Sequence, residues 1–151
     1  MKAISILALA SLLTAGTVLA STGHDTGHAA KAKAATRVVK LDASEYAFSA
    51  KAISFKAGET VKFVITNNGK QKHALTIGTA AEQAEHQAEM EKMAAMNHDE
   101  SERGMPANSI HVAPGETREL VWSFTAPGQL LFACSYPGHA DLGMTGDITI
   151  R

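Results

Sequence analysis

Short runs of alternating apolar and polar residues make up most of the chain from residue 37 onward. In the run 60–66, Val61, Phe63 and Ile65 fall on one face, because the side chains of a strand alternate between its two faces. Glycine, proline and asparagine separate the runs, which is typical of turns. This pattern predicts an all-β protein, a sandwich of antiparallel strands. The expected strands are residues 38–41, 46–48, 53–55, 60–66, 73–77, 110–112, 119–124, 129–134 and 147–150.

Two of these strands follow the same kind of turn. Residues 57–66 (A-G-E-T-V-K-F-V-I-T) and 114–123 (P-G-E-T-R-E-L-V-W-S) both place G-E-T before an alternating run. This internal sequence similarity is compatible with a Greek-key sandwich, whereas two copies are too few for a repeat protein. In the second of these strands Trp122 alternates with Leu120 and Phe124, so we expect it in the core.

One segment departs from the strand pattern. Residues 80–98 contain no glycine or proline and almost no β-branched residue, and they are rich in alanine, glutamate, glutamine, lysine and methionine. These residue types favour a helix. We therefore expect one helix over about 80–98, followed by a loop, as an insertion at 80–108 within a single domain of residues 37–151.

The first twenty residues have the pattern of a signal peptide. Lys2 is followed by the apolar run 3–19, and Val18 and Ala20 supply small residues at a cleavage site. An uncleaved membrane anchor is the alternative, although the run is slightly short for a membrane span. We expect export to the periplasm with cleavage near Ala20 and no remaining span. The small and polar residues 21–36 are expected to be a disordered tail.

Composition and charge narrow the class of protein. The formal net charge of the 151 residues is −1, and acidic and basic residues are interleaved, so there is no basic stripe of the kind that nucleic-acid binding requires. Cys134 is the single cysteine. In an oxidising compartment a lone thiol is incidental, joined to another chain, or protected by a metal.

The residues around this cysteine favour the metal. Residues 134–144 (C-S-Y-P-G-H-A-D-L-G-M) place Cys134, His139 and Met144 on one short loop, with glycines at two bends. Thiolate, imidazole and a long axial thioether accept both Cu(I) and Cu(II), with a second imidazole completing the set. His73 is the best candidate for that imidazole, because it opens a strand after a turn-rich segment. The alternative is that His73 is an ordinary surface histidine.

The Cys-x₄-His-x₄-Met loop, followed by the strand T-G-D-I-T-I, resembles the cupredoxins. The loop is more similar to those of rusticyanin and azurin than to that of plastocyanin. The resemblance covers residues 37–151 apart from the insertion, and implies a Greek-key β-sandwich with one mononuclear type 1 copper ion near one end. A dinuclear copper site would need a second cysteine. The chain departs from the family at Ala74, where many cupredoxins place an asparagine that bonds across to the cysteine loop.

The insertion carries a second set of soft ligands. His86, Met90, Met93 and Met96 recur at helical spacing, and His98 follows them. One interpretation is that the stripe packs on the sandwich, since methionine fills gaps well; another is an accessory site for Cu(I); the third is a flexible lid. His24 and His28 in the tail are candidates for a weaker copper site, and His111 is expected to be structural or at the surface.

These residues leave three functions to weigh. The first is an exported protein that binds or buffers copper and confers copper tolerance, with a copper-handling partner. The second is a one-electron carrier between redox partners, docking through an apolar patch of Pro137, Ala140 and Leu142 around His139. The third is an enzyme, which would need further copper sites with H-x-H pairs, and the sequence contains none. We expect a copper-binding protein rather than an enzyme.

Overall fold

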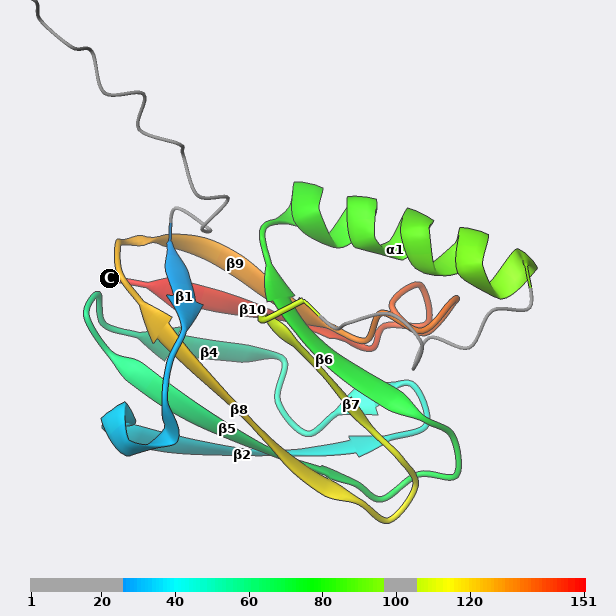
Figure 1. Ribbon diagram of the computed structural model, residues 1–151, viewed down its shortest axis with the longest axis horizontal. Helices are drawn as coiled ribbons and strands as arrows, with labels where there is room; N and C mark the ends of the chain where they lie inside the picture. The colour runs from blue at the N-terminus through cyan, green and yellow to red at the C-terminus, as the bar shows by residue number, and fades with distance from the viewer. Residues whose placement is uncertain (1–25, 97–105) are drawn as a thin grey trace, which may run out of the picture.

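Two β-sheets and one α-helix form the fold of the computed structural model, which describes residues 26–96 and 106–151 (Figure 1). The helix α1 spans Ala80–Ala95, and a short 3₁₀ helix spans Ala32–Ala34. The strands are β1 (Gly27–Ala29), β2 (Arg37–Ser44), β3 (Ala47–Phe48), β4 (Ala52–Phe55), β5 (Thr60–Asn67), β6 (His73–Gly78), β7 (Ser109–Val112), β8 (Thr117–Phe124), β9 (Gly128–Ala133) and β10 (Thr145–Ile150).

Each sheet has five strands, in the orders β1-β8-β5-β2-β3 and β4-β10-β9-β6-β7. Most hydrogen-bonded neighbours are not neighbours in sequence, so the chain crosses between the sheets as a Greek-key sandwich requires. All nine expected strands correspond to observed ones. The sandwich is not wholly antiparallel, however, because β2 pairs parallel with β5 and β4 pairs parallel with β10. Strand pattern alone does not reveal the direction of pairing between distant segments.

The core lies between the two sheets and is rich in aromatic rings. Val61, Phe63 and Ile65 of β5 are fully buried, as the alternation predicted. Phe55 from the other sheet stacks on Phe124 with ring centroids 4.6 Å apart. Trp122 is 1% exposed, which confirms its place in the core. Burial of these large apolar side chains is the main stabilising contribution to such a sandwich.

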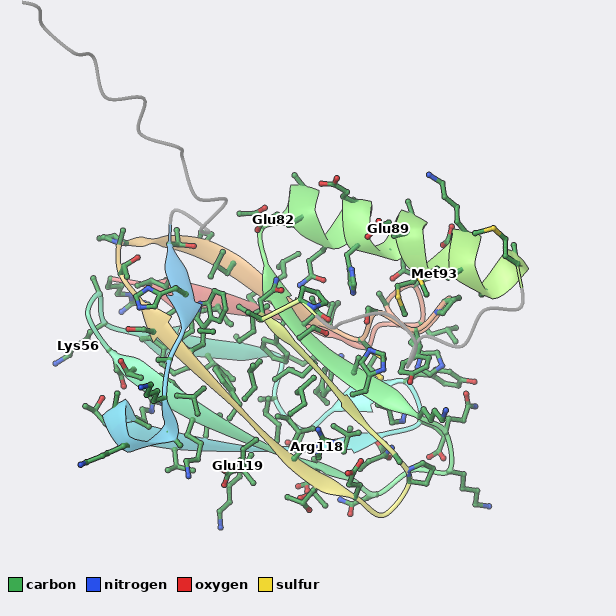
Figure 2. The ribbon with its side chains drawn as sticks, in the orientation of Figure 1. Lys56, Glu82, Glu89, Met93, Arg118 and Glu119 are labelled. Carbon is green, nitrogen blue, oxygen red and sulfur yellow. The ribbon has the colours of Figure 1, made fainter. Side chains whose placement is uncertain are left out.

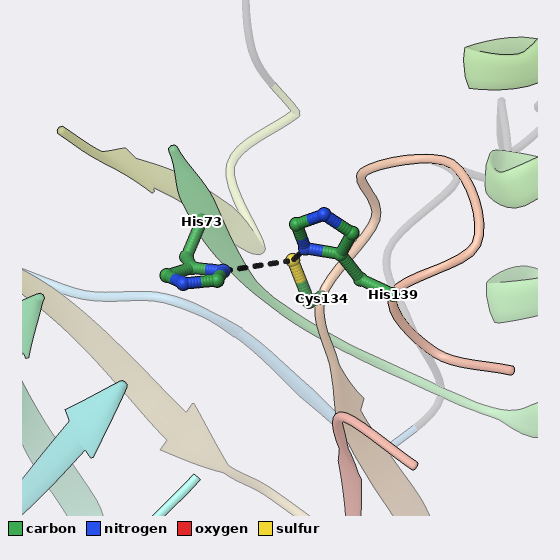
Figure 3. Close-up of side chains that lie close together, drawn as sticks. All are labelled: His73, Cys134 and His139. Atoms are coloured by element: carbon green, nitrogen blue, oxygen red, sulfur yellow. Dashed lines mark hydrogen bonds between the residues drawn. The ribbon is translucent and has the colours of Figure 1, made fainter. Parts of the chain in front are cut away.

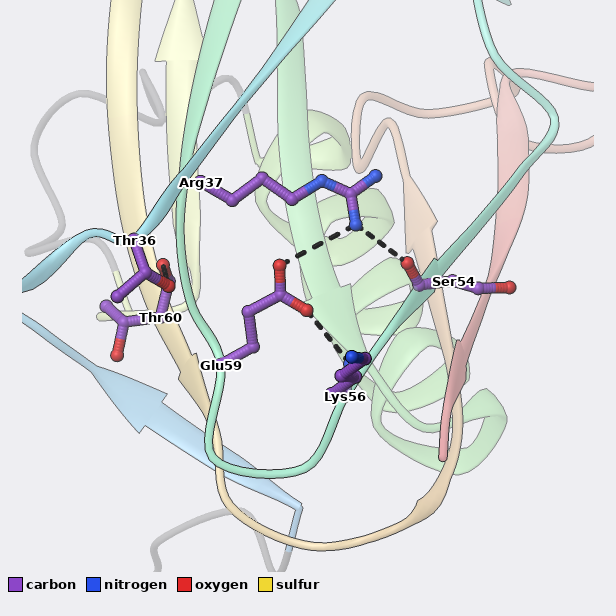
Figure 4. A network of polar contacts seen from close by, with 6 residues as sticks. All are labelled: Thr36, Arg37, Ser54, Lys56, Glu59 and Thr60. Atoms are coloured by element: carbon purple, nitrogen blue, oxygen red, sulfur yellow. Dashed lines mark hydrogen bonds and ion pairs between the residues drawn. The ribbon is translucent and has the colours of Figure 1, made fainter.

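A polar network joins the sheets at one edge (Figure 4). The Arg37 guanidinium of β2 donates to the Ser54 carbonyl of β4 at 3.0 Å and lies 3.6 Å from a Glu59 carboxylate oxygen. The same guanidinium lies over the Phe55 ring, 5.0 Å from its centroid. Because Arg37 is half exposed to water, we interpret this network as a modest structural tie between the sheets.

The helix α1 begins at a capping box. The Thr79 hydroxyl accepts from the Glu82 N–H, and the Glu82 carboxylate accepts from the Thr79 N–H at 2.7 Å. Gln83 then donates to the Thr76 carbonyl at 2.8 Å and to the Leu131 carbonyl at 3.3 Å, which fixes the helix against β6 and β9. The observed helix ends at Ala95; residues 97 and 98 of the expected helix lie outside the described residues.

Part of the expected disordered tail is ordered. Residues 21–25 lie outside the described residues, but Gly27–Ala29 form β1, paired antiparallel with β8, and residues 32–34 form a 3₁₀ turn. The expectation of disorder is therefore wrong for residues 26–36. The reason is a tertiary contact, because the edge of β8 supplies hydrogen-bond partners for residues 27–29. Glycine fits this close approach, since a Cβ at Gly27 would lie only 2.3 Å from the Trp122 indole.

No helix within the described residues is long and apolar enough to cross a membrane. The expected signal peptide, residues 1–20, lies outside those residues.

Candidate metal centre

His73 enters the site from the start of β6. The preceding turn is held by Asn67, whose side-chain amide donates to the Gln71 and Val112 carbonyls at 2.7 and 2.9 Å and accepts from the Gly69 N–H at 2.9 Å. β6 then pairs with β7, with His73 opposite Val112. These contacts leave His73 only 1% exposed, so the surface alternative for this residue does not hold.

Cys134 follows β9 at the start of the ligand loop, which we define as residues 134–144. The Cys134 N–H donates to the Met144 carbonyl, and the Met144 N–H donates to the His139 carbonyl, both at 3.0 Å. Gly138 and Gly143 adopt φ angles of 77° and 97°, in the left-handed region that glycine enters without strain. The loop therefore folds back on itself and holds its three predicted ligands together.

The three potential metal ligands Cys134, His73 and His139 converge in the interior (Figure 3). The Cys134 Sγ lies 3.4 Å from Nδ1 of His139 and 3.9 Å from Nδ1 of His73. All three ligand atoms lie within 4.8 Å of one another. Among the described histidine, cysteine and acidic residues, this is the one group of three or more close enough to hold a metal ion.

Burial sets the charge state of the two imidazoles. Desolvation lowers the pKa of His73 below its ordinary value, and the neighbouring His139 lowers it further while Glu45 opposes the shift. Desolvation likewise lowers the pKa of His139. Both rings are thus neutral at pH 7, the form that coordinates a metal. A buried thiol beside two neutral imidazoles fits copper, which accepts soft sulfur and imidazole together.

Met144 has a fully buried side chain beside this group, and its backbone is bonded to both Cys134 and His139. This position suits a fourth, axial ligand. Its assignment as a ligand remains a prediction from the loop spacing.

Three buried hydroxyls lie close to the start of the ligand loop. Ala74 has no polar side chain, but its N–H donates to the Cys134 Sγ at 3.4 Å. Thr76 Oγ1 lies 2.8 Å from Ser109 Oγ and donates to Ser135 Oγ at 3.5 Å. Since Ser135 follows Cys134 directly, these hydroxyls connect the ligand loop to β6 and β7. Partners of this kind orient metal ligands.

Two tyrosines flank His139, and neither was singled out from the sequence. The Tyr46 ring meets the His139 ring edge-on with centroids 5.0 Å apart, and the Tyr136 ring lies 5.8 Å away. Tyr136 Oη also lies 3.2 Å from Nδ1 of His111. The position of Tyr136 within the ligand loop was a usable signal, whereas nothing near Tyr46 in sequence pointed to the site.

The predicted accessory ligands are only partly brought together. His86, Met90 and Met93 lie on the less exposed side of α1, but Met96 is 61% exposed and His98 lies outside the described residues. Met90 is 5% exposed. Nε2 of His86 is buried without a hydrogen-bond partner, and desolvation lowers the pKa of His86. Figure 2 shows Glu82, Glu89 and Met93 spread along this helix. An accessory copper site here remains a prediction.

His28 is the one tail histidine within the described residues. His28 lies in β1 with an exposed side chain, and His24 lies outside the described residues.

Comparison with known proteins groups the chain with copper proteins. Residues 35–151 match the family described as copper binding proteins, plastocyanin/azurin family. The chain is 37% identical over 152 aligned positions to the copper-resistant cuproprotein CopI of Pseudomonas aeruginosa, covering 85% of this chain and 84% of that protein. It is 38% identical over 125 positions to CopI of Rubrivivax gelatinosus, covering 83% of this chain and 71% of that protein. The solved structure of auracyanin B shares the fold, with a TM-score of 0.67 and 19% identity over 85% of this chain and 96% of that one.

Proposed function

Because this chain belongs to the plastocyanin/azurin family of copper-binding proteins, we propose that it is an exported protein that handles copper and contributes to copper tolerance. It is a cupredoxin with one type 1 copper site per chain. The proposed ligands of that copper ion are His73, Cys134, His139 and Met144. The observation that carries the proposal is the buried approach of the Cys134 thiol to two imidazole nitrogens at 3.4 and 3.9 Å.

The protein's own residues make this site suitable for copper in either oxidation state. Bound copper supplies one-electron chemistry, cycling between Cu(I) and Cu(II). The two imidazoles bind in their neutral form, and the Ala74 N–H donates to the Cys134 sulfur. The Cys134 side chain is buried, which keeps water away from the thiol and protects it from oxidation.

A role in tolerance is supported by the relatives named copper-resistant cuproproteins, which come from three bacteria. Export to the periplasm is part of the same proposal and rests on the pattern of residues 1–20. The partner we propose is a copper-handling protein. We propose no catalytic reaction for the chain.

The second candidate function is one-electron transfer between redox partners. In the ligand loop that carries His139, Leu142 is 63% exposed and Pro137 is also exposed. An apolar surface near a copper ligand suits a transient redox contact.

The first experiment tests the site. Copper-loaded parent protein should show an intense thiolate-to-copper absorption and one copper ion per chain, and Cys134→Ala should lose that absorption because it removes the only thiol. Circular dichroism of the variant checks that the sandwich is intact. An intense charge-transfer band in Cys134→Ala would refute the assignment.

A second experiment separates the two functions. A strain lacking the gene should grow poorly in copper-rich medium and recover with the parent gene but not with Cys134→Ala. Unchanged copper tolerance together with slower respiratory electron flow would favour the electron carrier instead.

A further inference from the structure

His139 is the proposed ligand nearest to solvent. Of the four proposed ligands, His73, Cys134 and Met144 are at most 1% exposed, while His139 is 7% exposed. Whatever covers the His139 ring therefore controls the shortest route between the centre and water.

Tyr46 covers that ring. Its own ring stands perpendicular to the His139 imidazole, at an interplanar angle of 89° and a centroid distance of 5.0 Å, an arrangement that aromatic pairs favour. The other flanking ring belongs to Tyr136, which lies within the ligand loop and packs against the core. Tyr46 instead comes from the opposite sheet, on the short connection between β2 and β3.

The backbone at Tyr46 is unusual for a tyrosine. Its φ is 61°, and within residues 26–96 and 106–151 it is the one non-glycine residue with a positive φ. In a two-residue turn such as Glu45–Tyr46 this conformation favours glycine or asparagine. Turn chemistry alone therefore disfavours a tyrosine here, and strained residues of this kind cluster at functional sites. The contact of the ring with His139 supplies a reason for the tyrosine.

The turn is tied to the segment that leads into His73. Gln71 donates to Tyr46 Oη at 3.0 Å, and the Lys70 N–H donates to the Glu45 carboxylate at 2.6 Å. Both bonds are exposed to solvent, so water replaces either partner at little net cost. Such contacts hold the ring in place without preventing it from moving aside.

We propose that Tyr46 is a cover over His139 that limits how fast copper enters and leaves the centre. The inference rests on the proposed copper-binding function and adds a residue that regulates copper exchange. Because the ring is not one of the ligands, its removal changes the rate of exchange more than the character of the site.

The test compares Tyr46→Gly with Tyr46→Phe in the full exported chain loaded with Cu(I). Each protein is mixed with excess bathocuproine disulfonate, and the absorbance of the chelated Cu(I) gives the release rate. We expect Tyr46→Gly to release copper about five to ten times faster than the parent, equivalent to about 1 to 1.4 kcal/mol of barrier. Tyr46→Phe keeps the ring and loses only the hydroxyl bond, so its rate should stay within about twofold of the parent, equivalent to about 0.4 kcal/mol.

The unfolding temperature tests whether faster copper release in Tyr46→Gly comes from a less stable fold. Glycine suits the positive φ, so copper-free Tyr46→Gly should unfold at a temperature no lower than the parent. The proposal fails if Tyr46→Gly releases copper at the parental rate, if Tyr46→Phe is as fast as Tyr46→Gly, or if the glycine variant unfolds at a clearly lower temperature. Failure of the parent to take up copper with a thiolate absorption would instead refute the proposed function.

Discussion

Two histidines on neighbouring strands have opposite orientations and different partners. In the pairing of β6 with β7, His73 lies opposite Val112, and Ala74 lies opposite His111. Because adjacent positions on a strand face opposite sides, His73 points to Cys134 while His111 points to the Tyr136 hydroxyl. The cross-strand pairs that contain the two histidines are adjacent, yet one histidine is a proposed copper ligand and the other bonds a tyrosine.

At this scale we predict that His73→Ala weakens copper binding much more than His111→Ala. Loss of a ligand should lower the affinity by more than about 100-fold, whereas loss of an outer partner typically costs about 10- to 100-fold. The affinities are measured by competition titration with a chelator of known affinity. Equal affinities in the two variants would remove His73 from the site.

The helix α1 is an added element whose least exposed side rests on β6 and β9. Met90 is buried and Gln83 anchors the helix to two carbonyls, both of which favour a packing role. The exposed Met96 does not share that packing. The accessory-site prediction and the packing explanation lead to opposite results when the stripe is replaced.

We predict that changing His86, Met90, Met93 and Met96 together to leucine preserves the type 1 spectrum and one copper ion per chain. Leucine keeps helix propensity and apolar volume. Removing the unpartnered Nε2 of His86 should also stabilise the copper-free protein by about 1 kcal/mol. Metal analysis and urea unfolding measure the two quantities. A fall in total Cu(I) bound, relative to the parent, would show that the stripe captures copper.

Over the whole molecule, two histidines inside the sandwich and one on helix α1 have lowered pKa values in the copper-free protein. Burial lowers the pKa values of His73, His86 and His139 below the ordinary 6.5. The unfolded chain therefore binds more protons than the folded one once the pH falls below about 6.5, and folding stability rises with pH in that range.

From this linkage we predict that the copper-free protein keeps its full stability above about pH 6.5 and becomes progressively less stable as the pH falls below that value. The copper-loaded protein should lose less, because bound metal competes with protons for the imidazoles of His73 and His139. Urea unfolding across this pH range, with and without copper, measures both curves. A free energy of unfolding that does not change with pH in the copper-free protein would contradict the prediction.

Local sequence was sufficient for most elements and for the ligand loop. Alternation and turn residues located the strands, and the residue types of 80–95 identified the helix, because those signals depend on neighbours in the chain. The spacing of Cys134, His139 and Met144 likewise acts within one loop. The direction of the β2–β5 and β4–β10 pairs was missed, since strand pattern is the same for parallel and antiparallel partners.

The sequence by itself thus determined a copper-binding loop on a β-sandwich, because its three predicted ligands lie within eleven consecutive residues. The tertiary structure alone decided what surrounds them. It brings His73 to a cysteine 61 positions away, pairs residues 27–29 with β8, and places Tyr46 of the opposite sheet over His139. Contacts of this kind depend on how strands pair and how the two sheets pack face to face. A local pattern of residues does not determine which distant segments meet.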